Sequence, residues 1–240
     1  MGWLSITETR PLADWYDLNL KPHSGKVRLM TEMQKVVIVG TGGHAKVVAD
    51  TIRLEGKFDL VGFANEESNI NEFLACPVRP SVEAFQVSHF IVAVGANHVR
   101  AKIFEDCLKR GLQAVSTIHP SAILAPSVVI EAGTLVAAGA ILNPFAKVGS
   151  NSIINTGTVI EHDCMIGRHV HVAPGSKLAG NVSVGDCAFL GIGTIVIPQI
   201  MIGEFSTVGA GSVVIRDVSP RTTVVGSPAK ILERGRSFKI

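Results

Sequence analysis

The sequence predicts a small Rossmann-like α/β domain followed by a parallel β-helix, and two patterns carry this prediction. Over residues 34–117, strand-like and helix-like segments alternate, which is typical of a parallel sheet covered by helices. From Ile118 to Val214 every sixth residue is aliphatic, seventeen times in succession, and a small residue mostly precedes each by two positions. A six-residue repeat of this kind builds a parallel β-helix in which the aliphatic side chains stack along the axis.

The elements of the first domain follow in order along the chain. The stretch KVVIVG at 35–40 is continuous in β-branched residues, as in a buried strand of a parallel sheet. We expect the further elements to be a helix at His44–Leu54, strands at Asp59–Ala64 and His89–Val94, a helix at Asn97–Arg110 and a short strand at Gln113–Ile118.

Composition and breaker residues set the domain boundaries. Both Trp residues and the only Tyr fall within the first 16 positions. Residues 1–33 therefore differ from the rest of the chain and form an extension, or lie upstream of a start at Met33, with a short docking helix expected at Leu12–Leu20. The Rossmann-like domain spans 34–117 and the β-helix 118–216, and the Pro and Gly of SPRTTVVGSPAK end the repeat before a tail at 217–240.

Composition also excludes several classes of protein. Of 240 residues, 47% are hydrophobic and the net charge is +2, with Lys and Arg scattered singly, so a nucleic-acid binder is not expected. The four cysteines lie far apart without a CxxC pair, which favours reduced thiols in the cytosol over disulfides or structural zinc. No apolar run reaches 18 residues. We expect a cytoplasmic protein without membrane insertion.

One polar cluster interrupts the repeat. Glu161, His162 and Asp163 stand together in EHDC, where the repeat otherwise holds small residues or Gly, and a β-helix coil has no packing use for them. Histidine has the side-chain pKa nearest to working pH, which suits a general base. An acidic neighbour would hold its imidazole in one tautomer, and Asp163 is the expected partner, with Glu161 as the alternative.

A second motif lies in the first domain. Gly40, Gly42 and Ala45 satisfy G-x-G-x-x-[GA] directly after a strand and at the start of a helix, the context in which backbone N–H groups hold phosphates. A dinucleotide site would want an acidic residue after the second strand, where the chain has Asn65 and Glu66. A half-size domain with few strands fits a nucleotide sugar better than a dinucleotide.

Four motifs together carry a family resemblance: the hexapeptide ladder, GTGGHAK, NTGTVIEHDCMIG and VVGSPAK. They resemble the sugar acetyltransferases of the left-handed β-helix superfamily with a Rossmann-like N-terminal domain, which include bacillosamine, perosamine and sialic acid acetyltransferases. The resemblance covers about residues 34–232. It implies a left-handed β-helix and a homotrimer, with acetyl-CoA lying between neighbouring β-helices and active sites at the subunit interfaces.

The resemblance also implies roles for individual residues. His162 would be the general base, and the N–H of Gly180, in LAGN, would face the oxyanion of the tetrahedral intermediate. Asn65 stands where relatives often have Asp, so ribose recognition would have shifted to Glu66 or been lost. Residues implied to contact acetyl-CoA are His171, Gly180, Ile192, Ala210 (Gly in relatives) and Lys230. The alternative for His171 is contact with the acceptor, and the alternative for Lys230 is an ordinary surface lysine. Residues implied to bind the acceptor are Gly42, Gly43, His44, Asn65, Glu66, Gly95 and Asn155.

The expected reaction is N-acetylation of a UDP- or GDP-linked 4-amino-4,6-dideoxy sugar by acetyl-CoA, with no metal. Three rivals stay open: O-acetylation of a sialic-acid-type sugar, a nicotinamide-dependent oxidoreductase using GTGGHAK, and a trimeric scaffold without catalysis. A zinc site is a further alternative, because His169 and His171 would point the same way on a strand. The spacing of His162, His169 and His171 differs from that of β-helix zinc enzymes, which argues against it.

Overall fold

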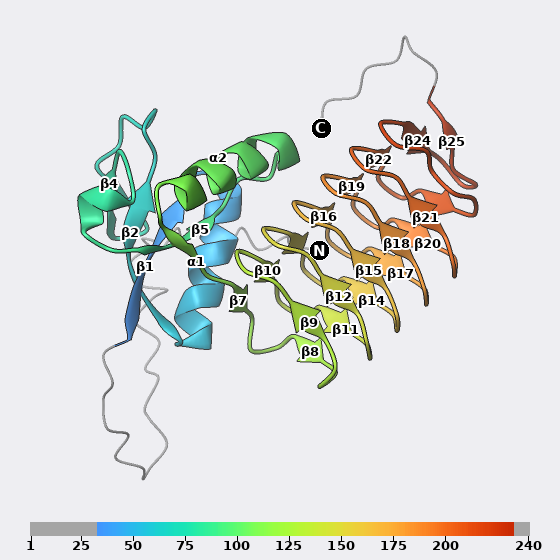
Figure 1. Ribbon diagram of the computed structural model, residues 1–240, viewed down its shortest axis with the longest axis horizontal. Coiled ribbons are helices and arrows are strands. Elements are labelled where there is room, and N and C mark those ends of the chain that lie inside the picture. Colours follow the sequence, from blue (N-terminus) through green and yellow to red (C-terminus); the bar gives the residue numbers. More distant parts are fainter. Residues whose placement is uncertain (1–32, 233–240) are drawn as a thin grey trace, which may run out of the picture. The chain divides into compact units, whose positions relative to one another are not determined.

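The computed structural model describes residues 33–232 of the chain. They form an α/β domain, built on a mixed β-sheet, followed by a parallel β-helix (Figure 1). The expected extension, including a helix at Leu12–Leu20, lies outside the described residues, as do residues 233–240. Within residues 33–232, no helix combines the length and apolar character needed to cross a membrane.

The first domain is built on a six-stranded sheet with the order β3-β4-β2-β1-β5-β6. All neighbours pair in parallel except β3, which is antiparallel to β4. The strand β1 lies inside the sheet, between β2 and β5, and its side chains are therefore buried on both faces, as its β-branched sequence predicts. The strands are β1 (Gln34–Val39), β2 (Phe58–Ala64), β3 (Glu72–Phe73), β4 (Cys76–Arg79), β5 (His89–Val92) and β6 (Gln113–Ala114).

Two helices cover opposite faces of this sheet. Val36 and Ile38 of β1 pack against α1 (Gly43–Glu55), whereas Val37 belongs to the cluster that contains Phe104 of α2 (Asn97–Lys109). The α1 cluster also takes in Leu135 and Ile153 of the β-helix, so α1 is packed between the sheet and the β-helix. A short 3-10 turn, η2 (Glu83–Phe85), completes the domain.

The β-helix consists of three parallel sheets, and each coil of 18 residues contributes one two-residue strand to each sheet. The first sheet contains β7 (Thr117–Ile118), β10 (Leu135–Val136), β13 (Ile153–Ile154), β16 (His171–Val172), β19 (Phe189–Leu190), β22 (Thr207–Val208), β24 (Thr223–Val225) and, antiparallel at its end, β25 (Lys230–Ile231). The second contains β8 (Ile123–Leu124), β11 (Ile141–Leu142), β14 (Val159–Ile160), β17 (Lys177–Leu178), β20 (Ile195–Val196) and β23 (Val213–Val214). The third contains β9 (Val129–Ile130), β12 (Lys147–Val148), β15 (Met165–Ile166), β18 (Ser183–Val184) and β21 (Met201–Ile202).

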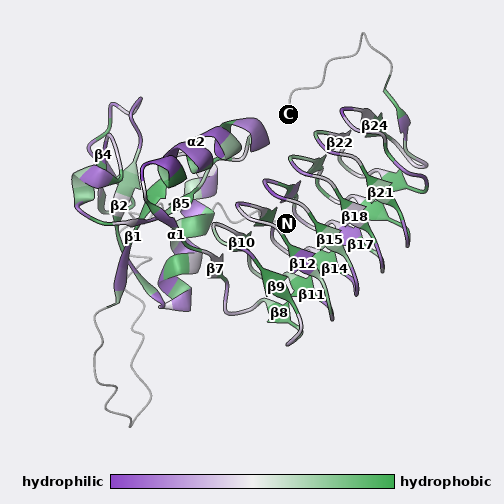
Figure 2. Cartoon of the chain, viewed as in Figure 1, coloured by the Kyte–Doolittle hydropathy of each residue, from purple (hydrophilic) through white to green (hydrophobic). Residues whose placement is uncertain are grey.

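The aliphatic ladder forms the core of the β-helix, as the six-residue repeat predicts. Every ladder residue from Val136 to Val214 is at most 4% exposed, and the small residues before them, such as Ala140 and Thr158, are fully buried. Figure 2 shows hydrophobic residues along most strands, with hydrophilic positions at β12 and β17, where Lys147 and Lys177 point outward. Only the inward position is therefore constrained by the core.

Three columns of corners connect the sheets, and we number them by the sheets that they join. The first corner leads from the first sheet to the second (155–158 in one coil), the second corner from the second to the third (161–164), and the third corner returns to the first sheet (167–170). Most corners contain one residue with positive φ. In the first corner it is a glycine every 18 residues, from Gly139 (φ 67°) to Gly211 (φ 67°), because glycine adopts this conformation without steric cost.

The structure differs from the sequence expectation at three places. The expected strand at Gln113–Ile118 divides into β6, which completes the first domain, and β7, which begins the β-helix. The short strands β3 and β4 were not expected, because Pro77 and the brevity of the segments give them no periodic pattern. Coil pairing continues beyond residue 216, through a bridge from Ile202 to Val218 and through β24, before β25 (Lys230–Ile231) turns back antiparallel.

Candidate active site

The cluster EHDC occupies a second corner, between β14 and β15. The Nδ1 atom of His162 lies 2.8 Å from Oδ2 of Asp163. Asp163 has φ 60°, and this left-handed conformation, which Asp tolerates better than most residues, accompanies the contact with the neighbouring imidazole. Because the carboxylate accepts a hydrogen bond from Nδ1, the proton resides there and the lone pair of Nε2 remains available to accept another proton.

Gly180 occupies the same second-corner position one coil later. A Cβ atom at Gly180 would come within 2.6 Å of both Cε1 and Nε2 of His162, so the absence of a side chain leaves room for the imidazole. The carbonyl of Gly180 accepts a hydrogen bond from Gln199 N at 3.0 Å, while its N–H makes no backbone hydrogen bond among residues 33–232. The free N–H beside a candidate base suits a role in oxyanion stabilisation.

A second group of predicted residues gathers at the first sheet and the first corner. His171 points outward from β16 toward the α/β domain, with its ring centroid 6.1 Å from that of His44 and 5.3 Å from that of Phe189. Its Nε2 lies 3.1 Å from Nδ2 of Asn155, and its Nδ1 lies 3.4 Å from the carbonyl oxygen of Gly95. His44, His171, Asn155 and Gly95 therefore form one polar cluster where the two domains meet.

Both histidines of this cluster are neutral at physiological pH. Burial, followed by the charge of Arg100, lowers the pKa of His44 to about 4. Burial, then Arg100 and His44, lowers the pKa of His171 to about 3. The Nε2 atom of His44 is buried without a hydrogen-bond partner among the described residues. A buried polar atom of this kind calls for a partner, and a bound ligand would supply one.

The glycine-rich loop joins β1 to α1, as the sequence predicts. Gly40 has φ 115°, and a Cβ there would lie 3.1 Å from the carbonyl oxygen of Ala93, so the close approach of the loops after β1 and β5 requires glycine. Gly42 is the N-cap of α1, Gly43 is its first residue, and a Cβ atom at either would meet no atom within 4 Å. The loop thus leaves its helix N-terminus open to an anion.

Asn65 is tied to this loop. Its Nδ2 donates to Oγ1 of Thr41 at 2.7 Å, and its Oδ1 accepts from the N–H of Glu67 at 3.2 Å. Glu66, beside it, is exposed. The asparagine therefore fixes the geometry of the loop, which is a structural use for the residue that stands in place of the expected carboxylate.

Two of the residues expected to contact acetyl-CoA lie along the first corner. Ile192 and Ala210 hold equivalent positions in successive coils, and the side chain of Ile192 is 62% exposed. Lys230 lies on β25 at the end of the β-helix, where it is exposed. Ile192 and Ala210 follow Asn155 along the same column of corners.

The predicted site is therefore divided between two columns of corners of the β-helix. His162, Asp163 and Gly180 belong to the second corner, whereas Asn155, Ile192 and Ala210 belong to the first, with the second sheet between them. The outward positions of that sheet are mostly apolar, and Ile123 and Ile195 are 63% and 45% exposed. A single chain does not bring the two groups together.

His169 does not lie beside His171 on a strand, so that prediction from the sequence is wrong. His169 lies in a third corner with φ 58°, before β16 begins, and is buried against Phe104 of α2 at 5.7 Å between ring centroids. Its Nδ1 faces Nδ2 of Asn151 at 2.8 Å. Among residues 33–232, no three histidine, cysteine or acidic side chains are grouped as metal ligands.

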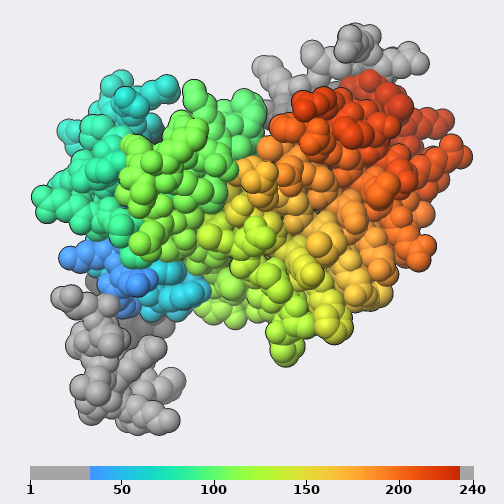
Figure 3. Space-filling model, viewed as in Figure 1, coloured from blue at the N-terminus to red at the C-terminus, as the bar shows by residue number. Residues whose placement is uncertain are grey.

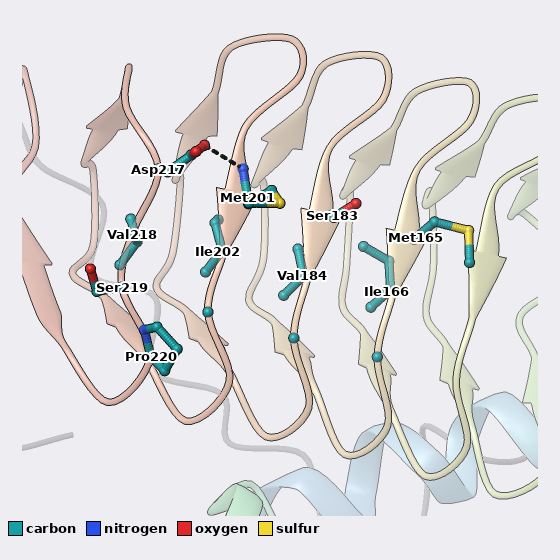
Figure 4. A pocket seen from close by; sticks show the side chains of 13 residues that line it. Met165, Ile166, Ser183, Val184, Met201, Ile202, Asp217, Val218, Ser219 and Pro220 are labelled. Carbon is teal, nitrogen blue, oxygen red and sulfur yellow. Dashed lines mark hydrogen bonds between the residues drawn. The ribbon is translucent and has the colours of Figure 1, made fainter.

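A groove of about 550 Å³ lies on the third sheet and its turn into the third corner (Figure 4). Met165, Met201 and Asp217 line it, and Oδ1 of Asp217 accepts a hydrogen bond from Met201 N at 2.8 Å. None of the sequence-predicted site residues lines this groove, so it is separate from the candidate active site.

Sequence reasoning missed residues that support the site. Arg100, Asn97 and Phe189 all contact the cluster around His171 or the coils that carry it. Phe189 follows His171 by 18 residues on the same sheet, so the coil length was a signal that could have found it. Arg100 and Asn97 carried no such signal, because their helix stands outside the repeat.

Comparison with known proteins agrees with this architecture. Residues 35–107 match the family model of the PglD N-terminal domain, and residues 145–180 match that of the bacterial transferase hexapeptide (six repeats). A mutant of perosamine N-acetyltransferase from Caulobacter crescentus, solved with CoA and GDP-perosamine, is 39% identical, with 84% of this chain and 98% of that chain covered and a TM-score of 0.79. The chain belongs to this family of sugar acetyltransferases.

Two further relatives extend the comparison. The acetyltransferase domain of PglB from Neisseria gonorrhoeae, in complex with acetyl coenzyme A, is 31% identical, with 84% of this chain and 100% of that chain covered and a TM-score of 0.79. UDP-N-acetylbacillosamine N-acetyltransferase from Bacillus subtilis is 40% identical over 113 residues, or 44% of this chain. That match spans about half the length of the curated relative, at 52%.

Proposed function

We propose that the protein transfers the acetyl group of acetyl-CoA to the amino group of a nucleotide-linked sugar. The observation that carries this proposal is the pair His162–Asp163 at 2.8 Å beside the side-chain-free Gly180. The amine nitrogen attacks the thioester carbonyl, Nε2 of His162 takes the proton that the nitrogen loses, and the Gly180 N–H donates to the oxyanion. The attack forms the C–N bond, and collapse of the intermediate restores the carbonyl and breaks the C–S bond. The CoA thiolate leaves and takes the proton from His162, which regenerates the base.

The acceptor is a 4-amino-4,6-dideoxy sugar carried on UDP or GDP. The open helix N-terminus at Gly42 and Gly43 suits a diphosphate, and the unpartnered Nε2 of His44 lies in the same cluster as His171. Relatives of this family are named for perosamine and bacillosamine, and one was solved with GDP-perosamine. These names support an amino sugar as acceptor. Because they include both nucleotides, the test compares UDP-linked with GDP-linked sugars.

Each active site is formed by two chains of a homotrimer. The base lies on the second corner and the acceptor cluster adjoins the first, with an apolar sheet surface between them. Burying that surface against a neighbouring copy would bring the second corner of one chain to the first corner of the next, and acetyl-CoA would lie along Ile192 and Ala210.

The test is CoA thiol release from acetyl-CoA with UDP- and GDP-linked 4-amino sugars, and with free and CMP-linked sialic acid. We expect turnover with a nucleotide amino sugar, and a loss of roughly 10²-fold in kcat for His162→Ala with acetyl-CoA binding retained. The matched control is His89→Ala, at the amino end of β5, which should keep activity. Turnover on sialic acid alone, or turnover independent of His162, would reject the proposal.

A further inference from the structure

Arg100, on α2, is 1% exposed, yet its hydrogen-bond acceptors are all neutral oxygens. Burial lowers its pKa only to about 10, so the guanidinium is charged. A buried charge is tolerated where its donors are satisfied, and all three nitrogens of Arg100 donate. An arrangement this costly indicates a specific use.

The acceptors of Arg100 lie in both domains. On the α/β side, Nη1 donates to the carbonyl oxygens of Val94 at 3.0 Å and Gly95 at 3.1 Å. On the β-helix side, Nε donates to Asn151 O at 3.0 Å and Nη2 to His169 O at 2.8 Å. The side chain of Arg100 therefore holds the loop after β5 against the third corners of two consecutive coils.

Asn97 extends this contact to the next coil. Its Nδ2 donates to the carbonyl oxygens of Cys187 at 3.1 Å and Ala188 at 2.9 Å, and its Oδ1 accepts from Nη2 of Arg100 at 2.8 Å. The two side chains thus anchor the start of α2 to three consecutive coils. Figure 3 shows the green surface of the first domain directly against the yellow and orange coils.

The anchored loop leads to His171 through one shared oxygen. The carbonyl of Gly95, which accepts from Arg100, also faces Nδ1 of His171 at 3.4 Å. On the other side of the ring, Oδ1 of Asn155 accepts from Thr156 N at 2.8 Å, so its Nδ2 must be the group that donates to Nε2 of His171. The proton of neutral His171 therefore resides on Nδ1 and points at Gly95.

We propose that Arg100, assisted by Asn97, is a positioning residue that fixes the orientation and tautomer of His171 by holding the Gly95 carbonyl in place. This inference rests on the proposed function where it concerns the acceptor site. The charge of Arg100 also contributes, after burial, to the lowered pKa of His171, which keeps the ring neutral. Loss of the anchor would let the Gly95 loop and the first domain shift relative to the coil that carries Asn155.

The test uses Arg100→Lys, Arg100→Met and the milder Asn97→Ala in the full chain, with Arg168→Met as the matched control. Arg168 adjoins the same corner but is 58% exposed and paired with Asp186 at the surface. The first readout needs no substrate: ¹⁵N NMR of histidine-labelled protein reports which ring nitrogen of His171 carries the proton. We expect one Nδ1–H tautomer in the wild type and in Arg168→Met, and a mixture in the Arg100 variants.

The second readout is steady-state kinetics of thiol release. We expect kcat/KM for the amino-sugar acceptor to fall about tenfold or more in Arg100→Lys, with KM for acetyl-CoA within about twofold of wild type, and a smaller fall for Asn97→Ala. Folded variants with the wild-type tautomer and kinetics would overturn the inference, as would equal losses for both substrates. If the Arg100 variants do not fold, the tautomer of His171 and the kinetics of thiol release in Asn97→Ala test the inference instead. Absence of transfer in the wild type would reject the proposed function. The NMR measurement would still test whether Arg100 fixes the tautomer of His171.

Discussion

Complementation between two inactive chains tests whether each active site takes its base and its acceptor cluster from different subunits. One chain carries His162→Ala and lacks the proposed base on the second corner. The other carries Asn155→Ala with His171→Ala and lacks the acceptor cluster near the first corner. Neither substitution touches the aliphatic ladder, so both chains should fold and assemble.

The expected recovery follows from the arrangement of the corners. In a cyclic trimer that contains both chains, only one of the three interfaces joins an intact second corner to an intact first corner. Mixed trimers purified through two different tags should therefore show about one third of wild-type activity per trimer, and an unpurified equal mixture about one quarter. Each parent alone should stay below a few per cent, because loss of a general base costs roughly 10²-fold.

The assay is thiol release, with native mass spectrometry to count the chains of each type. A matched pair, His162→Ala with Asp163→Ala, places both lesions on the same corner and should recover nothing beyond the activity of its parents. Mixed trimers no more active than their parents, despite correct assembly, would refute an active site shared between chains.

Three further predictions concern pH, the site and the core. The pKa values of His44 and His171 lie below 6.5 in the folded protein, so the unfolded chain binds protons more readily as the pH falls. The contribution of these histidines to the free energy of unfolding is therefore fully present above pH 6.5. It falls as the pH drops toward 4, by about 2 kcal/mol for each histidine at pH 5. Thermal unfolding should show this decline, and a double substitution to Gln should flatten it. Gly180→Ala should displace the His162 ring and lower kcat by tenfold or more while the melting temperature changes little; full activity would contradict the 2.6 Å approach. Ile160→Ala should cost 2–5 kcal/mol by urea unfolding, whereas Leu54→Ala, at a half-exposed position, should cost much less.

The sequence alone determined the β-helix and the internal register of its site. The core accepts only an aliphatic side chain at each inward position, so the six-residue period appears directly in the sequence and was confirmed over its whole length. The same regularity makes residues 18 apart neighbours in space, which places Gly180 against His162. The strand, glycine loop and helix of the first domain were likewise local patterns, and β1 and α1 lie where they were predicted.

Only the tertiary structure decided how the two domains meet. The hydrogen bonds from Asn97 and Arg100 to the β-helix join residues 51 to 91 positions apart, and no period relates a helix to the carbonyl oxygens of a coil. The repeat places His169 at the positive-φ position of a third corner, as it does Asn151 and Cys187, and the packing of α2 buries its ring in the interface. Periodic packing is recorded in the sequence because each coil repeats it, whereas a single docking contact occurs once and becomes visible only in three dimensions.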